Sequence, residues 1–314
     1  MGESLLWVLQ NLVLAPWYLL QALISAPSWL SWTWNGLSST EDKQALMRFI
    51  YYGASHQFLF VFIDFFLLLL VLGLWRQRLL WLWVRIGEGF GNSVGRAAAW
   101  AGLLMVLQQV IIVFLQRIFR VAEIKFGLGA PLGYEFFDFL TFGFDLSWWA
   151  EELKLYNAII VTLCCAYTFI QGGHVRVDLF YAGMRFRAKK VVDMIGSVLF
   201  MMPALNLIWL YAWFFMWRHL VTPKVSASDK FELLLRKARI LKWNVETIGF
   251  SPNGFNGYFL FKVLMVAFVF MMLVQAMTFF FRSLAEFREG PEAEGKYLDK
   301  DTLGEGEEVY EGTH

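Results

Sequence analysis

The sequence predicts an all-α integral membrane protein, a polytopic bundle of about five transmembrane helices with one further N-terminal helix. Of its 314 residues, 58% are hydrophobic and only 17% are charged, whereas an average soluble domain has about 25% charged residues. The chain contains 32 Phe and 15 Trp. Its apolar residues also come in runs of about 20, the length that a helix needs to cross the hydrocarbon core of a bilayer.

Four runs meet this standard directly, at residues 57–75, 100–119, 153–170 and 257–281. A fifth, at residues 191–220, is longer than one crossing requires and contains Pro203, so we expect one long, tilted helix with a kink. The run at residues 5–24 is interrupted by polar residues and Pro16. We expect it to be either embedded in the membrane or interfacial.

The distribution of Lys and Arg predicts the orientation of these spans. Basic residues accumulate at 76–96 and 176–190, and such connections are usually cytoplasmic. The acidic connection at 121–152 then lies outside. Residues 222–256 also lie outside by alternation, although they contain six Lys and Arg, and we predict that they form an amphipathic helix on the bilayer surface.

These elements divide the chain into three predicted regions. Residues 1–99 are an N-terminal extension with one embedded or interfacial helix and one transmembrane helix. Residues 100–285 form a membrane domain of four helices with an insertion at 222–256. Residues 286–314 are acidic and almost free of bulky apolar side chains, which predicts a disordered, cytoplasmic tail.

Composition and motifs exclude several other classes of protein. A net charge of +1 provides no electrostatic footprint for nucleic acid. Cys164 and Cys165 are adjacent inside an apolar run, which suits neither a disulfide framework nor a metal cluster. The chain also lacks the G-x-x-x-x-G-K-[ST] and H-E-x-x-H motifs. We therefore expect no enzyme activity, no nucleic-acid partner and no cofactor in this chain.

Four charges are expected to meet at the outer ends of two neighbouring helices. Arg117 and Arg120 close one predicted span, and Glu151 and Glu152 open the next. An ionisable side chain in lipid is costly unless it is paired or hydrated. We predict an ion-pair clasp that fixes helix packing or docks another subunit; the alternative is four charges that reach independently into the headgroups.

A second polar group follows the third clear span. Gly172 and Gly173 loosen the helix as it leaves the membrane, and His174, Arg176 and Asp178 come next. His174 and Asp178 share a face if the chain continues as a helix, and all three share one if it becomes extended. We expect them to brace this loop against a partner rather than to perform chemistry.

Two histidines leave another function open. His56 and His219 are both predicted near the outer face, and a haem-binding bundle needs facing histidines on different helices at matched depth. A haem-binding membrane anchor of a redox complex is therefore an alternative function. A stand-alone channel or carrier is a third.

Three motifs in order carry a resemblance to a known family. A helix end with arginines, Leu115–Arg120, precedes a Trp-x-Glu-Glu-Leu element within Trp148–Leu153. A Gly-x-His-Val-Arg-Val-Asp element follows at Gly172–Asp178. On these motifs, residues 100–285 resemble the small membrane subunit (DctQ-like, or Q subunit) of tripartite ATP-independent periplasmic (TRAP) transporters.

The resemblance implies a multi-pass protein of the bacterial inner membrane, in a sodium-coupled importer of organic anions that are often carboxylates. A periplasmic binding protein captures the solute, and a large membrane subunit holds the solute and sodium sites. The small subunit packs against the static scaffold of the large one and supports docking of the binding protein. Residues 1–99, the long connection at 121–146 and the insertion at 222–256 make this chain an enlarged form, in contact with membrane lipids.

Overall fold

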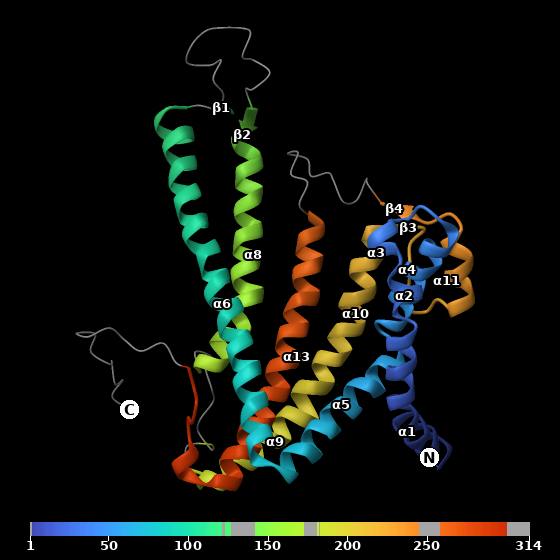
Figure 1. Ribbon diagram of the computed structural model, residues 1–314. Coiled ribbons are helices and arrows are strands. Elements are labelled where there is room, and N and C mark those ends of the chain that lie inside the picture. The colour runs from blue at the N-terminus through green and yellow to red at the C-terminus, as the bar shows by residue number, and fades with distance from the viewer. Residues whose placement is uncertain are drawn as a thin grey trace, which may run out of the picture.

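The computed structural model describes residues 2–120, 123–126, 142–172, 181, 183–244 and 258–299, and is almost entirely helical (Figure 1). Within these ranges, six helices are long and apolar enough to cross a membrane: the five predicted spans and the N-terminal helix at Glu3–Ile24. The predicted all-α polytopic fold is therefore confirmed.

The helices follow one another along the chain as α1 (Gly2–Ile24), α2 (Ala26–Leu30), α3 (Trp32–Asn35), α4 (Thr40–Tyr52), α5 (His56–Trp75), α6 (Gln77–Val113), α8 (Leu146–Gln171), α9 (Phe186–Gly196), α10 (Met202–Leu220), α11 (Phe231–Ala238) and α13 (Tyr258–Glu289). Two π-helical turns, η1 (Phe114–Ile118) and η3 (Ser197–Met201), extend α6 and join α9 to α10, and a 3-10 turn, η4 (Pro291–Ala293), follows α13. Two antiparallel pairs of short strands complete the described elements: β1 (Glu123–Phe126) with β2 (Phe142–Asp145), and β3 (Val221–Thr222) with β4 (Lys242–Trp243).

The helix α13 lies at the centre of the bundle. It contacts α6, α8, α9 and α10, and half of its most apolar window is buried, against 6% to 17% in the other five candidate spans. The helices α6 and α8 form a long antiparallel hairpin on one side of α13, and α1 packs on α5 on the other side (Figure 1).

The helix α6 begins much earlier than the sequence predicts. We expected a connection at 76–99 and a span at 100–119, but one helix runs from Gln77 to Ile118. The break that separates it from α5 is the single extended residue Arg76 (φ −130°, ψ 109°). Gly87, Gly91 and Gly95, within the expected connection, lie where this helix is pressed against α8 and α13, and that packing offsets their low helix propensity.

The predicted long helix at 191–220 is present, and it runs from Phe186 to Leu220. Its irregular point is η3, the widened turn at Ser197–Met201 that ends just before Pro203. Proline has no N–H to donate to the carbonyl four residues earlier, which here lies within this widened turn. The kink expected from Pro203 therefore takes the form of a π-helical turn.

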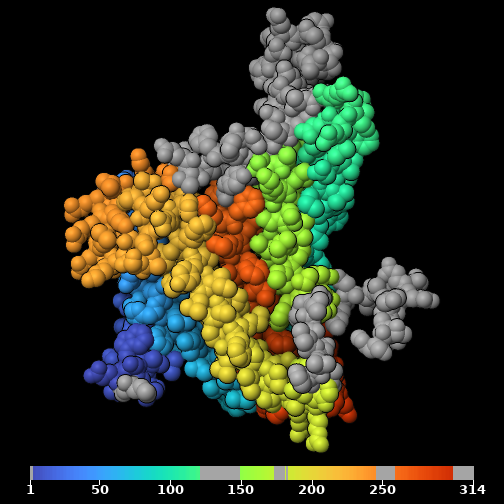
Figure 2. Space-filling model, turned by 180° about the vertical axis from the view of Figure 1, so that it is seen from behind, coloured from blue at the N-terminus to red at the C-terminus, as the bar shows by residue number. Residues whose placement is uncertain are grey.

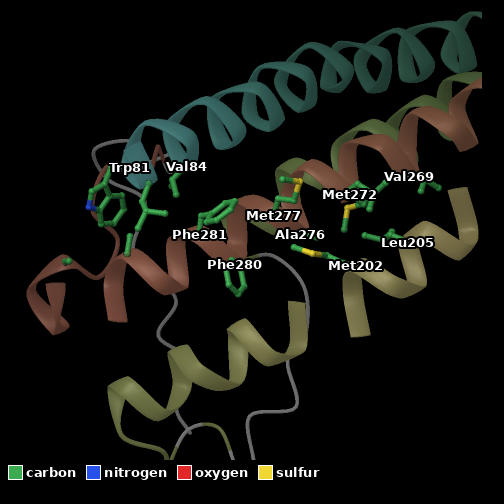
Figure 3. Close-up of a cluster of buried hydrophobic side chains, with 14 residues drawn as sticks. Trp81, Val84, Met202, Leu205, Val269, Met272, Ala276, Met277, Phe280 and Phe281 are labelled. Atoms are coloured by element: carbon green, nitrogen blue, oxygen red, sulfur yellow. The ribbon is translucent and has the colours of Figure 1, made fainter. Parts of the chain in front are cut away.

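The main hydrophobic core follows α13. Val269, Met272, Ala276, Met277, Phe280 and Phe281 of α13 are buried between side chains of α6 and α10 (Figure 3). Phe281 is completely buried, and its ring contacts that of Phe66 on α5 at a centroid distance of 5.3 Å. This core holds the N-terminal extension and the following helices together as one bundle.

A second core lies in a lobe formed by α4, α11 and the end of α10, which we call the α4–α11 lobe. Leu46 and Ile50 of α4 and Leu234 of α11 are fully buried in it. The indoles of Trp209 and Trp213 donate to the carbonyls of Gly53 and Ile50, both at 2.9 Å. Figure 2 shows the part of this lobe that follows α10 (orange) projecting from one side of the bundle.

The lobe adds a protein contact to the prediction for residues 222–256. The amphipathic helix is present as α11, and Leu234, Ala238 and the following Leu241 are buried in the protein. Leu233 and Ile240 are exposed, so contact with the bilayer surface stays a prediction. The N-terminal extension supplies the apolar partner, α4, that sequence alone could not assign to α11. Residues 245–257 lie outside the described part of the chain.

The start of α4 carries a capping box that stabilises this lobe. The Ser39 hydroxyl accepts from the Asp42 N–H at 3.0 Å and donates to the Asp42 carboxylate at 2.6 Å. Hydrogen bonds from Ser39, and from other nearby serines and Asn35, hold the pKa of Asp42 well below its ordinary value. The helix is thereby fixed at its N-terminus.

The prediction of a disordered tail from residue 286 onward is wrong for residues 286–299. The helix α13 continues to Glu289, and residues 290–299, which we call the C-terminal strap, fold back against α6. Glu286, Glu289, Glu294 and Asp299 all have cationic partners; Glu289, for example, pairs with Lys296 at 3.1 Å. Residues 300–314 lie outside the described part of the chain.

Candidate functional site: a buried ion-pair cluster between helices

A bidentate ion pair joins the lower ends of α6 and α13 as drawn in Figure 1. Arg282 of α13 donates through Nη2 to Glu88 Oε2 at 2.6 Å, and through Nε to the other oxygen of the same carboxylate. The two residues are only 8% and 5% exposed. This two-pronged geometry is the strong form of an arginine–carboxylate pair.

Glu286 extends the pair to a third helix. It lies one turn after Arg282 and accepts from Nη1 of that residue at 3.1 Å. Lys190 of α9 places its Nζ 2.6 Å from the other oxygen of Glu286. We call Glu88, Lys190, Arg282 and Glu286 the Arg282 cluster. Its two cations balance its two anions, the condition under which buried charges are tolerated.

Close helix approach surrounds the cluster. Gly87, Gly91 and Gly95 are spaced by four residues, so they share one face of α6. The Gln275 side chain of α13 donates to the Gly87 carbonyl at 2.9 Å. A methyl group on Gly95 would overlap the side chain of Tyr167 on α8. Small residues at this spacing let helices pack closely within a membrane.

The C-terminal strap closes the same end of the bundle. Arg96 donates to the two oxygens of Asp299 at 2.8 and 3.1 Å. Asn92 of α6 and Gln171 of α8 both donate to the Asp299 carbonyl at 2.9 Å. The hydrogen-bonded Arg96 guanidinium holds the pKa of the Asp299 carboxyl below its ordinary value. The strap thus ties α13 to α6 and α8.

Together these contacts make a structural lock. The charged groups of the Arg282 cluster are hydrogen-bonded to one another across α6, α9 and α13, and a fully satisfied polar network in a low-dielectric setting is rigid. Among the described residues, no group of three His, Cys, Asp or Glu could hold a metal ion. The arrangement can fix helix positions and offers no exposed reacting group.

The predicted clasp is not formed within the described part of the chain. No ion pair there joins Arg117 or Arg120 to Glu151 or Glu152. Both arginines are exposed, and Arg120 has a left-handed backbone (φ 54°) just beyond the end of η1. A clasp that is internal to the subunit is therefore absent here, and docking to another subunit remains a prediction.

The two glutamates have partners within the bundle. Glu151 pairs with Lys154 at 3.1 Å. Glu152 accepts from Gln108 Nε2 of α6 and from the Tyr156 hydroxyl, both at 2.9 Å. Gln108 therefore marks the side of α6 that faces α8. Arg117 follows it by nine residues, which places it close to the opposite side of an ideal helix.

The other predicted groups are placed as follows. Gly172 ends α8 with a left-handed backbone (φ 75°). Gly173, His174, Arg176 and Asp178 lie outside the described residues. The His56 ring packs on Trp7 at 5.7 Å, whereas His219 Nδ1 lies 2.8 Å from the Phe215 carbonyl oxygen.

Sequence reasoning missed the Arg282 cluster because both of its main members were assigned to positions outside the spans. Glu88 was counted in a connection, and Arg282 follows the predicted end of the last span by one residue. The signal was nevertheless present. Glycines at 87, 91 and 95 on one helical face next to an acidic residue indicate a packed helix with a buried charge.

A family comparison agrees with the motifs. Residues 139–229 match the family model of the DctQ component of tripartite ATP-independent periplasmic transporters. No curated protein and no solved structure matched the chain. The matched segment includes β2, α8, α9, α10 and β3, so it contains two of the three motifs, those at 148–153 and 172–178.

This match bears on the class of the protein as well as on its fold. The family is a component of transporters and not a class of enzymes, and the six candidate spans suit a multi-pass protein of the inner membrane. The match occupies part of a longer chain, and the larger size fits an enlarged form. Residues 139–229 therefore form a segment similar to the DctQ component of TRAP transporters, within a longer chain that has further helices on both sides of it.

Proposed function

We propose that this chain is the scaffold subunit of a sodium-coupled TRAP importer of organic anions, with carboxylates as the expected solutes. It packs against the static part of the large membrane subunit and supports docking of the periplasmic binding protein. The solute and sodium sites belong to the large subunit, so this chain binds no cofactor. Its C-terminus is cytoplasmic, as the basic residues at 76–96 and 176–190 favour.

The Arg282 cluster is the observation that carries this proposal. A scaffold must hold its helices in place while a neighbouring subunit moves. Arg282, Glu88, Glu286 and Lys190 connect three helices through short, buried, charge-balanced contacts. Separating α6 or α9 from α13 would leave a buried charge without its partner, which is strongly unfavourable.

The exposed surface of α6 supports a large apolar contact. Beyond Gly102 one half of the helix circumference presents large apolar side chains that are 44% to 55% exposed: Leu103, Leu104, Val106, Leu107, Val110, Ile111, Val113 and Phe114. A continuous apolar surface of this extent marks a lipid or protein contact. In the proposal, lipid covers part of it and the large subunit covers the rest.

Arg117 and Arg120 are the charges at the end of this surface. Both are exposed, so they are available to acidic groups of the large subunit. We therefore propose them as subunit-contact residues. Glu152 is held by Gln108 and Tyr156, and its role in the proposal is to fix α8 on α6.

Reconstitution tests the function. Vesicles containing the large subunit and this chain, supplied with the binding protein and a sodium gradient, should accumulate an organic acid. Vesicles lacking this chain should show a strongly reduced rate, and vesicles containing this chain alone should show none. Uptake by this chain alone would contradict the scaffold role.

A charge reversal tests the proposed contact. Arg117→Glu/Arg120→Glu should reduce co-purification with the large subunit. Arg218→Glu/Arg239→Glu is the matched control, because both residues are also exposed but lie at the end of α10 and just after α11. Equal losses in both variants would remove Arg117 and Arg120 from the contact.

A further inference from the structure

An apolar cavity lies beside the elbow where α5 turns into α6, at the lower end of the molecule in Figure 1. Its volume is about 120 Å³, and it is open on one side. Phe281 of α13 lines it from within the bundle. The walls come from the two helices of the elbow, including Leu69, Leu72, Leu79, Leu82 and Ile86.

Five of the eight side chains that line this cavity come from α6, and we call it the groove. Leu79, Leu82 and Ile86 are spaced by three and four residues, so they share one face of this helix. Their exposed fractions are 37%, 51% and 57%. The groove is therefore accessible from outside the bundle, and its walls suit a flexible hydrocarbon chain.

Three arginines surround the elbow. Arg76 is the linking residue itself, and Arg78 lies in the first turn of α6. Arg288 of α13 donates to the Gly73 carbonyl of α5 at 3.0 Å. All three are exposed, and within the described part of the chain none forms an ion pair. The elbow is thus a concentration of positive charge at one end of an apolar groove.

The backbone adds to this positive character. Arg76 is the N-cap of α6 and provides no side-chain hydrogen bond to it. The first N–H groups of a helix have no partner within the helix and carry a partial positive charge. They therefore reinforce the attraction of the arginines for an anion.

We propose that this elbow binds one anionic phospholipid. Its phosphate is held by Arg76, Arg78 and Arg288, and one acyl chain lies in the groove against Leu72, Leu79 and Leu82. Basic residues beside transmembrane helices on the cytoplasmic side are typical of anionic lipid sites. Charge complementarity selects the headgroup, and the apolar walls require an attached chain.

This site is separate from the proposed subunit contact. It is formed by the N-terminal extension and α13, outside the DctQ-matched residues 139–229. A bound acyl chain would fill the space beside Phe281 and so stabilise the packing of α5 and α6 on α13. Lipid binding at the elbow can therefore be tested without the large subunit.

The test uses the full chain, purified in detergent, stripped of lipid and titrated with phosphatidylglycerol or phosphatidylcholine. Native mass spectrometry counts the bound lipid, and thermal unfolding reports its effect. One phosphatidylglycerol should bind in preference to phosphatidylcholine and raise the unfolding temperature. Arg76→Gln/Arg78→Gln should weaken phosphatidylglycerol binding about 30-fold, since each basic residue near a lipid headgroup contributes about fivefold.

Two further variants distinguish the contribution of the arginine charges to lipid binding from that of the apolar groove. Arg218→Gln/Arg239→Gln removes the same charge from exposed positions at the end of α10 and in the α4–α11 lobe, and should leave binding unchanged. Leu79→Trp fills the groove and should weaken binding while all three arginines remain. Equal binding of both lipids, equal loss in the control, or full competition by inorganic phosphate would overturn the proposal.

Discussion

Replacing Arg282 by glutamine should destabilise the protein more than any change at an exposed ion pair. The Arg282 side chain makes four hydrogen bonds: two to Glu88, one to Glu286 and one to the Lys296 carbonyl. Glutamine keeps some of the volume but removes the positive charge, so Glu88 stays buried without its cation. Breaking a buried pair from one side costs about 3–5 kcal/mol.

Arg96→Gln is the matched control. Its pair with Asp299 has a similar distance, 2.8 Å, but the two side chains are 43% and 58% exposed. Exposed ion pairs contribute about 0–1 kcal/mol. Unfolding in detergent micelles, followed by circular dichroism, should therefore separate the two variants clearly.

A double variant shows whether the stability lost in Arg282→Gln comes from the unpaired charge of Glu88. Glu88→Leu/Arg282→Met removes both charges and leaves apolar groups of similar size, so it should recover most of the stability that Arg282→Gln loses. If Arg282→Gln cost no more than Arg96→Gln, the Arg282 cluster would not be the lock described here.

Three further predictions concern other parts of the bundle. Gly95→Ala should destabilise it by about 1–3 kcal/mol because the added methyl meets Tyr167, whereas Gly89→Ala, with nothing within 4 Å, should stabilise it by up to about 1 kcal/mol; thermal unfolding measures both. Because Arg96 lowers the pKa of Asp299, the anchoring of the strap should be complete above about pH 4 and lost as the pH falls through the lower folded pKa. Hydrogen exchange of the strap should show this release, and Asp299→Asn should show no such pH dependence. The purified chain should have no Soret band in its visible spectrum, and a strong band would favour the haem alternative.

Hydropathy was sufficient to predict the spans because their cause is local. Each run of about 20 apolar residues can satisfy its backbone only as a helix in a membrane. The start of α6 could not be found in this way. Residues 77–99 contain three arginines, which we interpreted as part of a cytoplasmic connection. They form a helix instead, because α8 and α13 pack against the face that holds Gly87, Gly91 and Gly95.

Contacts between residues far apart in the sequence could not be predicted either, because hydropathy describes only local segments. Glu88 and Arg282 are 194 positions apart, and α11 finds its apolar partner in α4. The clasp prediction considered that the four charges lie at the ends of neighbouring helices. It did not consider which side of each helix the charged side chains occupy. Gln108, and not Arg117, lies on the side of α6 that meets Glu152.

The central claim is that this subunit stays fixed while its partner moves, and pulsed electron paramagnetic resonance can measure that directly. Nitroxide labels at Gly89→Cys on α6, where nothing lies within 4 Å of an added Cβ, and at the exposed Arg185→Cys before α9 would report one distance across the Arg282 cluster. Cys164 and Cys165 would be replaced by alanine. In the assembled transporter, one narrow distance should persist with and without sodium, solute and binding protein. A second distance that appears on adding them would show that the helices of this subunit move, and would contradict the account.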